Sequence, residues 1–285
     1  MWNLKIIINN ILDKFGYRVV KKKYRFPKKN PLNSKFALGF NKDDLNLNIG
    51  SGGKSYPFFI NLDIPSNHYK EVQKKNKFVP YDLTKDKLPY ENNTVSNIFC
   101  SHVIEHCEDS TVDKLFYECL RVLKKDGVFR ITCPDSKFLF EVSSFENEYW
   151  HRTKNQYVGE NWYGRHRNTI TNDDCFIREI STNKLFLDKN SYDKTIIEYK
   201  KLNYSDAVRF LTKGNKADIK SIGNHINYFD YEKIQNKLKD AFSKLDIKNY
   251  KIINSKPKGS VSQLMSEDSF GEIEHMSIFV DCVKL

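Results

Sequence analysis

The residues of this chain that could do chemistry include a glycine-rich turn and two aspartates, each near the end of an apolar run. Gly50-Ser51-Gly52-Gly53 follows the first run, and Asp63 and Asp82 come near the ends of the next two. A glycine-rich turn lets a ligand approach the backbone without a side chain in the way. Asp63 is placed to accept hydrogen bonds from both hydroxyls of a ribose, while Asp82 and the N–H of Leu83 suit an adenine ring. Together these groups predict an adenosine-shaped site.

Three histidines are candidates for accepting a proton. His102 and His106 belong to the segment His102-Val103-Ile104-Glu105-His106, and His225 lies where a long insertion returns to the predicted sheet. An imidazole titrates near neutral pH, so it can take the proton of an alcohol. The spacing H-x-x-E-H also matches inverted zincin proteases, but that motif needs both histidines on one helix, and His102 directly follows a predicted strand. A role in packing or capping alone stays open for these histidines.

Other polar residues offer binding groups. Arg165-His166-Arg167 could hold a phosphate or carboxylate, or form a solvated loop, and Tyr228 lies in the same segment as His225. These four residues are the candidates for contacting the substrate. The pair Asp173-Asp174 lacks a clear third ligand, so we expect no metal site there or elsewhere.

A sheet must position these groups, because short apolar runs alternate with helical patterns from residue 45 onward. We expect helices at residues 111–125, with a Ser110–Asp113 capping box and Gly127 as a stop, and at 231–245. The expected strands are residues 45–49, 59–64, 78–83, 95–100, 128–132, 250–254 and 276–283. The predicted fold class is α/β: a Rossmann-like, seven-stranded, mostly parallel sheet flanked by helices, with a helical or irregular cap insertion before the last strands.

Residues 1–35 differ from the rest of the chain. They carry ten Lys or Arg against one Asp, which is +9 of the total net charge of +11 and leaves +2 for the other residues. Apolar positions at helical spacing within 2–24 predict a helix, either lying on an anionic membrane surface or packed on the domain. We therefore expect a basic leader helix and linker at 1–35 and one domain at 36–285, with the aromatic-rich segment 138–224 as a cap over the substrate.

The ordered segments LNLNIGSGG, INLDI, VPYDLTKDKLPYENNTVSNIFCSHVIEH and ECLRVLKKDGVFRITCPD resemble class I methyltransferases of the methyltransferase type 11 kind, over residues 45–135. The resemblance implies S-adenosyl-L-methionine as cofactor. Only 12 residues separate Gly50 from Asp63, fewer than the ~20 of a dinucleotide fingerprint, so the first helix must be very short or lost and NAD is disfavoured. By resemblance, the cofactor contacts would be Gly50, Ser51 and Gly52 around the methionine portion, Asp63 and the adjacent Ile64 at the ribose, Asp82 and Leu83 at the adenine, and Ser101 at the amino-acid end.

The resemblance does not decide the acceptor, because this family methylates lipids, quinones, sugars, small acids and proteins. The stretch IIINNILDKFGYRVVKK resembles leaders of bacterial methyltransferases encoded with surface-polysaccharide genes. We therefore expect O-methylation of a sugar, or of a phosphate-type group such as a phosphoramidate, on a small-molecule or nucleotide-linked precursor of capsule or lipopolysaccharide. Two alternatives stay open: a lipid or quinone methyltransferase at the membrane surface, and a non-catalytic S-adenosylmethionine-binding partner subunit.

Composition narrows the partners and the compartment. Hydrophobic residues make up 39% of the chain and aromatic residues 14%, as in packed globular proteins. The basic charge is concentrated in the leader rather than around an active face, which disfavours a nucleic-acid partner. The six cysteines contain no C-x-x-C pair. We expect reduced, buried thiols and a cytoplasmic protein, with contact between the basic leader and the inner membrane left open.

Overall fold

The computed structural model describes most of the chain from residue 44 onward, and the described residues all lie within one compact unit, residues 31–285. The predicted leader at 1–35 lies outside the described residues, as do Arg165, His166 and Arg167. The described ranges are 44–56, 58–67, 69–75, 78–143, 171–181, 189–217, 223–256, 259–262, 264–266 and 276–285.

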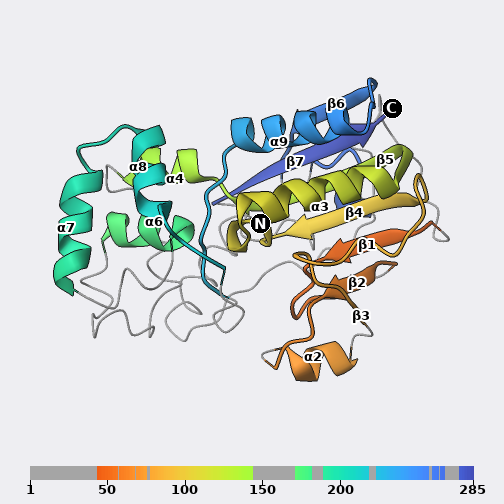
Figure 1. Cartoon of the computed structure of the whole chain (residues 1–285), viewed down its shortest axis with the longest axis horizontal. Helices are drawn as coiled ribbons and strands as arrows, with labels where there is room; N and C mark the ends of the chain where they lie inside the picture. The colour runs from red at the N-terminus through yellow and green to blue at the C-terminus, as the bar shows by residue number, and fades with distance from the viewer. Residues whose placement is uncertain are drawn as a thin grey trace, which may run out of the picture. The chain divides into compact units, whose positions relative to one another are not determined.

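One seven-stranded sheet forms the centre of the structure, in the order β3-β2-β1-β4-β5-β7-β6 (Figure 1). Strands β1 to β5 are parallel to one another, and β7 is antiparallel to both β5 and β6. This arrangement confirms the predicted fold class. The strands are β1 (Asn46–Ile49), β2 (Ile60–Asp63), β3 (Phe78–Pro80), β4 (Val95–Ser101), β5 (Leu123–Pro134), β6 (Tyr250–Asn254) and β7 (Ser277–Lys284).

The strand order reverses between β1 and β4, and this reversal places the site. Ile49 at the end of β1 pairs with Cys100 near the end of β4, so Gly50 and Ser101 follow neighbouring strands at the same edge of the sheet. Loops leaving such a point diverge in opposite directions and leave a crevice outside the carboxyl ends of the strands.

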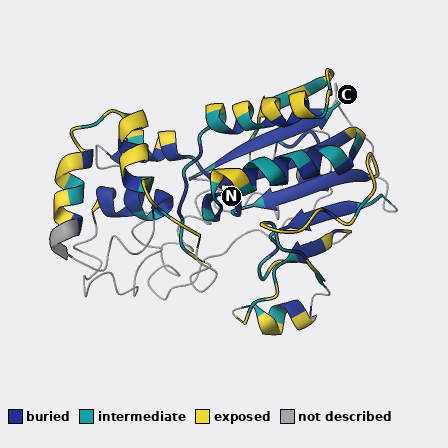
Figure 2. Ribbon diagram, in the orientation of Figure 1, coloured by how far each residue is buried: buried dark blue, intermediate teal, exposed yellow. Residues whose placement is uncertain are grey.

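Helices α3 (Asp109–Val122) and α9 (Tyr231–Lys244) pack on each other and on one face of the sheet (Figure 1). Their apolar residues join those of the central strands, most of whose residues are buried (Figure 2). The opposite face of the sheet is covered in part by Val261, Leu264 and Met265, around the short 3-10 helix η5 (Leu264–Ser266). The small helix α2 (Lys70–Lys75) precedes β3.

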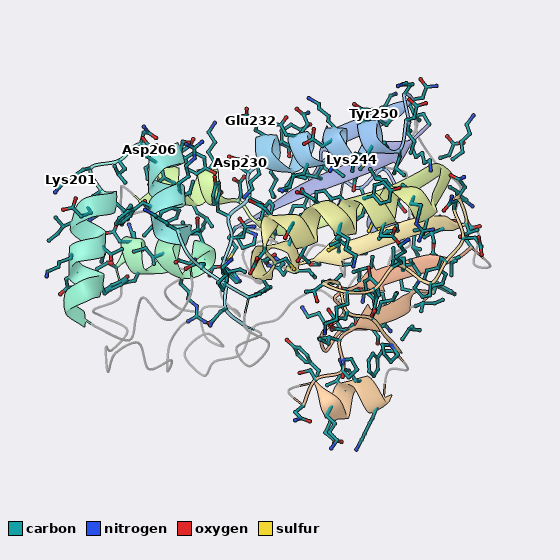
Figure 3. The ribbon with its side chains drawn as sticks, viewed as in Figure 1. Lys201, Asp206, Asp230, Glu232, Lys244 and Tyr250 are labelled. Atoms are coloured by element: carbon teal, nitrogen blue, oxygen red, sulfur yellow. The ribbon has the colours of Figure 1, made fainter. Side chains whose placement is uncertain are left out.

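Four helices of the predicted cap segment form a second core: α4 (Ser136–Ser143), α6 (Asn172–Ile180), α7 (Lys189–Tyr199) and α8 (Tyr204–Thr212). The hydroxyl of Tyr204 at the start of α8 lies 2.7 Å from Oγ of Ser136 and donates to Oδ2 of Asp230, 2.8 Å away. Asp230, labelled in Figure 3, also caps α9 by accepting from the N–H of Lys233. Tyr204 therefore ties α8 to the start of both α4 and α9.

The paired aspartates of α6 serve this second core. Asp174 forms a capping box with Thr171 and accepts from the hydroxyl of Tyr192 at 2.5 Å. Asp173 accepts from the hydroxyl of Tyr199 and pairs with Lys200. Both carboxylates thus have structural partners, which is why this pair needs no ion.

The structure corrects the predicted limits of α3. The helix begins at Asp109 rather than 111, and Glu108 precedes it without a side-chain cap, so the predicted Ser110–Asp113 capping box is wrong. Asp113 instead accepts from Lys237 of α9, 2.7 Å away. The helix ends at Val122, well before Gly127, because the chain turns into an extended conformation at Leu123 and pairs with β4. Long-range pairing therefore ends this helix, not a glycine.

Two further expectations concern the neighbourhood of the site. Strand β3 ends at Pro80, so Asp82 lies in the turn beyond the strand rather than in the strand itself. Among the described residues between β1 and β2 there is no helix, as the short spacing between Gly50 and Asp63 predicts. All six cysteines are free and buried, which agrees with the prediction of reduced core thiols.

Candidate active site

The turn after β1 opens the site. The backbone N–H groups of Gly50 and Ser51 both donate to the carbonyl oxygen of Leu62, at 2.8 and 3.2 Å, which ties the turn to β2. Gly50 has a φ of +65°, and a Cβ at this position would lie 2.3 Å from Cγ2 of Val103. Only glycine satisfies both the backbone conformation and the packing.

Asp63, the last residue of β2, holds the other side of this turn. Its carboxylate accepts from the backbone N–H of Gly52 at 2.5 Å and from that of Ile64 at 2.7 Å. Burial raises the pKa of Asp63, and the two hydrogen bonds offset only part of that rise. Each oxygen keeps lone pairs, so the carboxylate can still accept from ligand hydroxyls.

Asp82 organises the loop after β3. Its Oδ1 accepts from both the backbone N–H and the hydroxyl of Thr84, and Lys85 pairs with Oδ2 at 2.9 Å. Burial alone would raise the pKa of Asp82, but the hydrogen bonds from Thr84 and Lys85 lower it overall. Within the described part of the chain, the backbone N–H of Leu83 donates to no protein atom, so it can serve a ligand.

A polar cluster follows β4. His102 has a φ of +54°, a left-handed conformation that is rare for residues other than glycine, and the chain then forms the 3-10 helix η2 (Ile104–His106). Nδ1 of His102 lies 3.0 Å from Oε1 of Glu105, whose side chain is 2% exposed. Burial alone would raise the pKa of Glu105, but the close approach of His102 lowers it overall, so the carboxyl group is ionised at neutral pH.

This geometry agrees with the argument against a protease. His102 lies in a turn and His106 ends a three-residue 3-10 helix, so the two residues do not share the α-helix that the H-x-x-E-H motif requires.

His225 reaches the same cluster from a distant part of the chain. The backbone carbonyl of Glu105 accepts from the N–H groups of Ile226 and Asn227, at 2.8 and 3.1 Å, and thereby attaches the returning segment to η2. The rings of His106 and His225 then meet edge to face, with centroids 4.7 Å apart. Burial lowers the pKa of both imidazoles, which favours their neutral forms at pH 7.

One cavity of about 520 Å³ connects these parts, a volume within the usual range for small-ligand sites. Eight predicted site residues line it: Gly50, Gly52, Asp63, Ile64, Asp82, Leu83, His102 and His106. Tyr69, Val103, Cys107, Gly223, Asn224 and Ile226 also line it.

Four other predicted residues do not line this cavity. Ser51 is buried within the turn, and Ser101 pairs with Thr132 of β5. His225 contacts the ring of His106, and Tyr228 packs against the side chain of Lys233, whose Nζ is 4.1 Å from the tyrosine ring centroid. The roles predicted for these residues and for the cavity-lining ones stay predictions.

Comparison with known protein families indicates what kind of domain contains part of this site. Residues 51–131 match the family described as methyltransferase domain. This segment, which holds β2, β3, β4 and most of β5, is therefore similar to a methyltransferase domain. The match agrees with the predicted cofactor, S-adenosylmethionine. No curated protein matches the chain in sequence.

Three solved structures illustrate what the comparison with known structures found. A SAM-dependent methyltransferase from Thermotoga maritima has 14% identity and a TM-score of 0.41, with both chains covered in full (100%). One from Mesorhizobium loti has 13% identity and a TM-score of 0.42, over 89% of this chain and 96% of that one. PKMT2 from Rickettsia typhi, in complex with AdoHcy, has 10% identity and a TM-score of 0.41, over 88% of this chain and 51% of that one. Because these TM-scores are all below 0.5, the assignment of the fold rests on the sheet order alone.

The residues present fit the cofactor on observations of this structure. The carboxylate of Asp63 lines the cavity with acceptor capacity for two ribose hydroxyls, and the N–H of Leu83 is available to a ring nitrogen. The turn at Gly50 and Gly52 lets a ligand approach the backbone, since both residues have positive φ and neither carries a side chain.

Glu105 had no predicted role, although it lies within the H-x-x-E-H segment. The signal available was the spacing of Glu105 between two histidines directly after a strand. The carbonyl groups of Asn224 and Glu179, which orient His106 and His225, were not predicted either. Backbone groups carry no sequence signal, because every residue has them.

Proposed function

We propose that this chain transfers the methyl group of S-adenosylmethionine to an oxygen of a small-molecule acceptor. The observation that carries the proposal is the single cavity, which has the Gly50 turn, Asp63 and Leu83 in one part of its wall and His102 and His106 in another. Bound S-adenosylmethionine supplies a sulfonium-activated methyl group. The protein must then hold two reactants in line and manage one proton, because the transfer needs little covalent help.

The histidines of the cavity are the candidates for accepting the proton that the acceptor loses. In the transfer, the acceptor oxygen forms a bond to the methyl carbon, the carbon–sulfur bond breaks with its electron pair going to sulfur, and the hydroxyl proton must leave. Nδ1 of His106 lies 2.9 Å from the carbonyl oxygen of Asn224, which can only accept, so Nδ1 carries the ring proton. The other ring nitrogen, Nε2, then has a lone pair that can take the acceptor's proton.

We propose a sugar hydroxyl or a phosphate-type group of a nucleotide-linked surface-polysaccharide precursor as the acceptor. The resemblance of the leader supports this class, and a basic segment such as residues 165–167, which lie outside the described residues, would suit a phosphate. The alternative acceptors are lipids or quinones at the membrane surface. In the described part of the chain, no helix is both long enough and apolar enough to cross a bilayer. The third alternative is a non-catalytic subunit that binds S-adenosylmethionine for a partner.

Calorimetry with S-adenosylhomocysteine, the demethylated product, tests the cofactor part of the proposal. Asp63→Ala should weaken binding by roughly 1.5–3 kcal/mol, the range for losing hydrogen bonds to a charged group. Asp44→Ala is the control, because this carboxylate pairs with Lys124 outside the cavity. Tight binding of NAD without binding of S-adenosylhomocysteine would contradict the proposal.

Methyl transfer to candidate acceptors tests the substrate part. The full chain would be incubated with methyl-labelled cofactor and, separately, nucleotide-linked sugars, quinone-containing vesicles and lipid vesicles. Labelling of the nucleotide-linked sugars supports the proposed acceptor class, and labelling of quinone or lipid alone overturns it. Cofactor binding with no labelling until a cell extract is added, followed by labelling that depends on a second protein, would identify the partner-subunit alternative.

A further inference from the structure

Three side chains with metal-binding atoms converge beside the cavity. They are Glu105 and His106, which are adjacent in η2, and His225, which joins them from the segment before α9. Their ligand atoms all lie within 4.8 Å of one another, so a single ion could contact all three. Two imidazoles and one carboxylate are a donor set that binds first-row divalent metals.

Both imidazoles have the tautomer that metal-binding histidines usually have. Nδ1 of His106 lies 2.9 Å from the carbonyl oxygen of Asn224, and Nδ1 of His225 lies 2.6 Å from that of Glu179. Because a carbonyl oxygen only accepts, each ring carries its proton on Nδ1 and keeps the lone pair on Nε2. Metal-binding histidines characteristically donate their second ring N–H to a carbonyl or carboxylate, which fixes the ring and its tautomer.

Glu105 is a buried carboxylate with few hydrogen-bond partners. The residue is 1% exposed, and among the described residues neither of its carboxylate oxygens receives a well-aligned hydrogen bond. The nearest polar partner is Nδ1 of His102, 3.0 Å from Oε1. A buried carboxylate is costly unless it is paired or coordinates a metal. One facing imidazole leaves most of its acceptor capacity unused.

We propose that Glu105, His106 and His225 bind a divalent transition-metal ion of the Zn²⁺ or Co²⁺ type. Two imidazole ligands favour this class over Mg²⁺ and Ca²⁺, which prefer oxygen ligands. Three protein ligands leave coordination positions for other groups. Because His106 also lines the cavity, such a position would be available to the acceptor oxygen.

The role of the ion rests on the proposed function, whereas the site itself does not. An ion at this site would occupy the Nε2 lone pair of His106, so that nitrogen could not also accept a proton. A coordinated hydroxyl instead loses its proton more readily, because the positive charge stabilises the oxyanion. The cluster would then hold the acceptor oxygen and lower its pKa through the ion.

Metal binding by the full chain tests the site directly. The protein is freed of metal with a chelator and titrated with Co²⁺, while Zn²⁺ retained after dialysis is measured by mass spectrometry. We expect one equivalent of either ion per chain, in competition with each other, and no comparable retention of Mg²⁺. Failure to retain Zn²⁺ or Co²⁺ would overturn the proposal.

Two variants locate the ion. Glu105→Gln and His225→Gln should each weaken Co²⁺ binding by at least the roughly 10- to 100-fold that loss of a ligand's hydrogen-bond partner costs. Glu118→Gln is the matched control, because Glu118 is an equally buried carboxylate, 3% exposed, that pairs with Arg121 outside the cluster. Unchanged binding in both cluster variants, or equal loss in the control, would contradict the assignment.

A measurement on the unmodified protein guards against variants that fail to fold. The NMR spectrum of the Co²⁺-loaded chain should contain two strongly shifted resonances that exchange with solvent, one from the Nδ1–H of each coordinated ring. A spectrum without such resonances would overturn the histidine ligation. Calorimetry with S-adenosylhomocysteine on the metal-free protein keeps the two proposals apart: normal cofactor binding without metal uptake would overturn only the metal site.

Discussion

A Cβ at position 50 would lie 2.3 Å from Cγ2 of Val103, which places the turn after β1 in direct contact with the start of the segment after β4. The two segments approach because β1 and β4 are neighbours in the sheet and their carboxyl ends lie at one edge. The turn predicted to face the cofactor and the segment that carries His102 and His106 are therefore packed as one unit.

Gly50→Ala should harm both stability and cofactor binding. The left-handed conformation costs about 1–2 kcal/mol for a residue with a Cβ, and the collision with Val103 adds about 1–3 kcal/mol of overpacking. Gly214→Ala is the control, because Gly214 also has a positive φ, +77°, but nothing lies within 4 Å of its Cβ position. Urea unfolding and calorimetry with S-adenosylhomocysteine check this prediction, and equal losses of stability in the two variants would contradict it.

The buried pair of Glu118 and Arg121 should make stability depend on pH in acid. Burial alone would raise the pKa of Glu118, but hydrogen bonds from Arg121 and from the N–H of Leu88 lower it overall. A lowered folded-state pKa means that the pair stabilises the protein above the pKa of an ordinary glutamate and loses this effect as pH falls through the folded value.

Arg121→Met should therefore lower the free energy of unfolding at pH 7 by about 3 kcal/mol, because it leaves a buried carboxylate without its charged partner. The difference in the free energy of unfolding between this variant and the unmodified protein should shrink as the pH falls below the pKa of an ordinary glutamate. Lys74→Met should cost less than about 1 kcal/mol, since Lys74 and Glu71 form an exposed pair. Urea unfolding across pH checks both, and a difference that grows in acid would show that the sign is wrong.

Tyr204→Phe should loosen the attachment of α8. The hydroxyl meets Ser136 and Asp230, so its loss leaves two partly buried polar groups with one partner fewer, at a cost of about 1–3 kcal/mol. Tyr117→Phe is the control, because the Tyr117 hydroxyl makes no hydrogen bond within the described residues. Faster proteolysis within the cap in Tyr204→Phe alone would support the prediction, and identical digestion of both variants would refute it.

The charge of residues 1–35 predicts how the leader behaves. A chain lacking these residues loses +9 of its net charge of +11, so any binding to anionic lipid vesicles should fall to background, while binding to neutral vesicles should be weak throughout. Binding of S-adenosylhomocysteine should be unchanged, since the cavity is lined by residues from Gly50 onward. Vesicle sedimentation and calorimetry check the two parts, and a truncated chain that fails to fold would show that the leader belongs to the domain.

The strands could be predicted closely because their apolar runs are short and bounded by turn residues. β6 has the predicted limits, 250–254, and β7 differs from its prediction by one residue at each end. The end of α3 was harder to predict from the sequence, since Leu123 is apolar and compatible with a continued helix. Its pairing with Val95 depends on a strand that lies earlier in the chain.

The grouping of Gly50, Asp63 and Asp82 at one edge of the sheet could be predicted from the sequence for a similar reason. These residues lie at or just after the ends of β1, β2 and β3, and parallel strands bring their ends to one edge. The contact between His106 and His225 could not be predicted from the sequence. It depends on hydrogen bonds from Ile226 and Asn227 to the carbonyl of Glu105, and such backbone contacts leave no pattern in the residue types.

Because all six thiols are buried, their reaction with an added reagent can report local unfolding of the chain. Burial raises the pKa of Cys100, Cys119, Cys133 and Cys282, so these residues react with alkylating reagents only when the surrounding structure exposes them. Three of them lie on the strands β4, β5 and β7 and one on α3, whereas Cys175 lies in α6 of the cap. The rate at which each thiol is alkylated would therefore time the opening of the sheet and of the cap separately, with no label added to the protein.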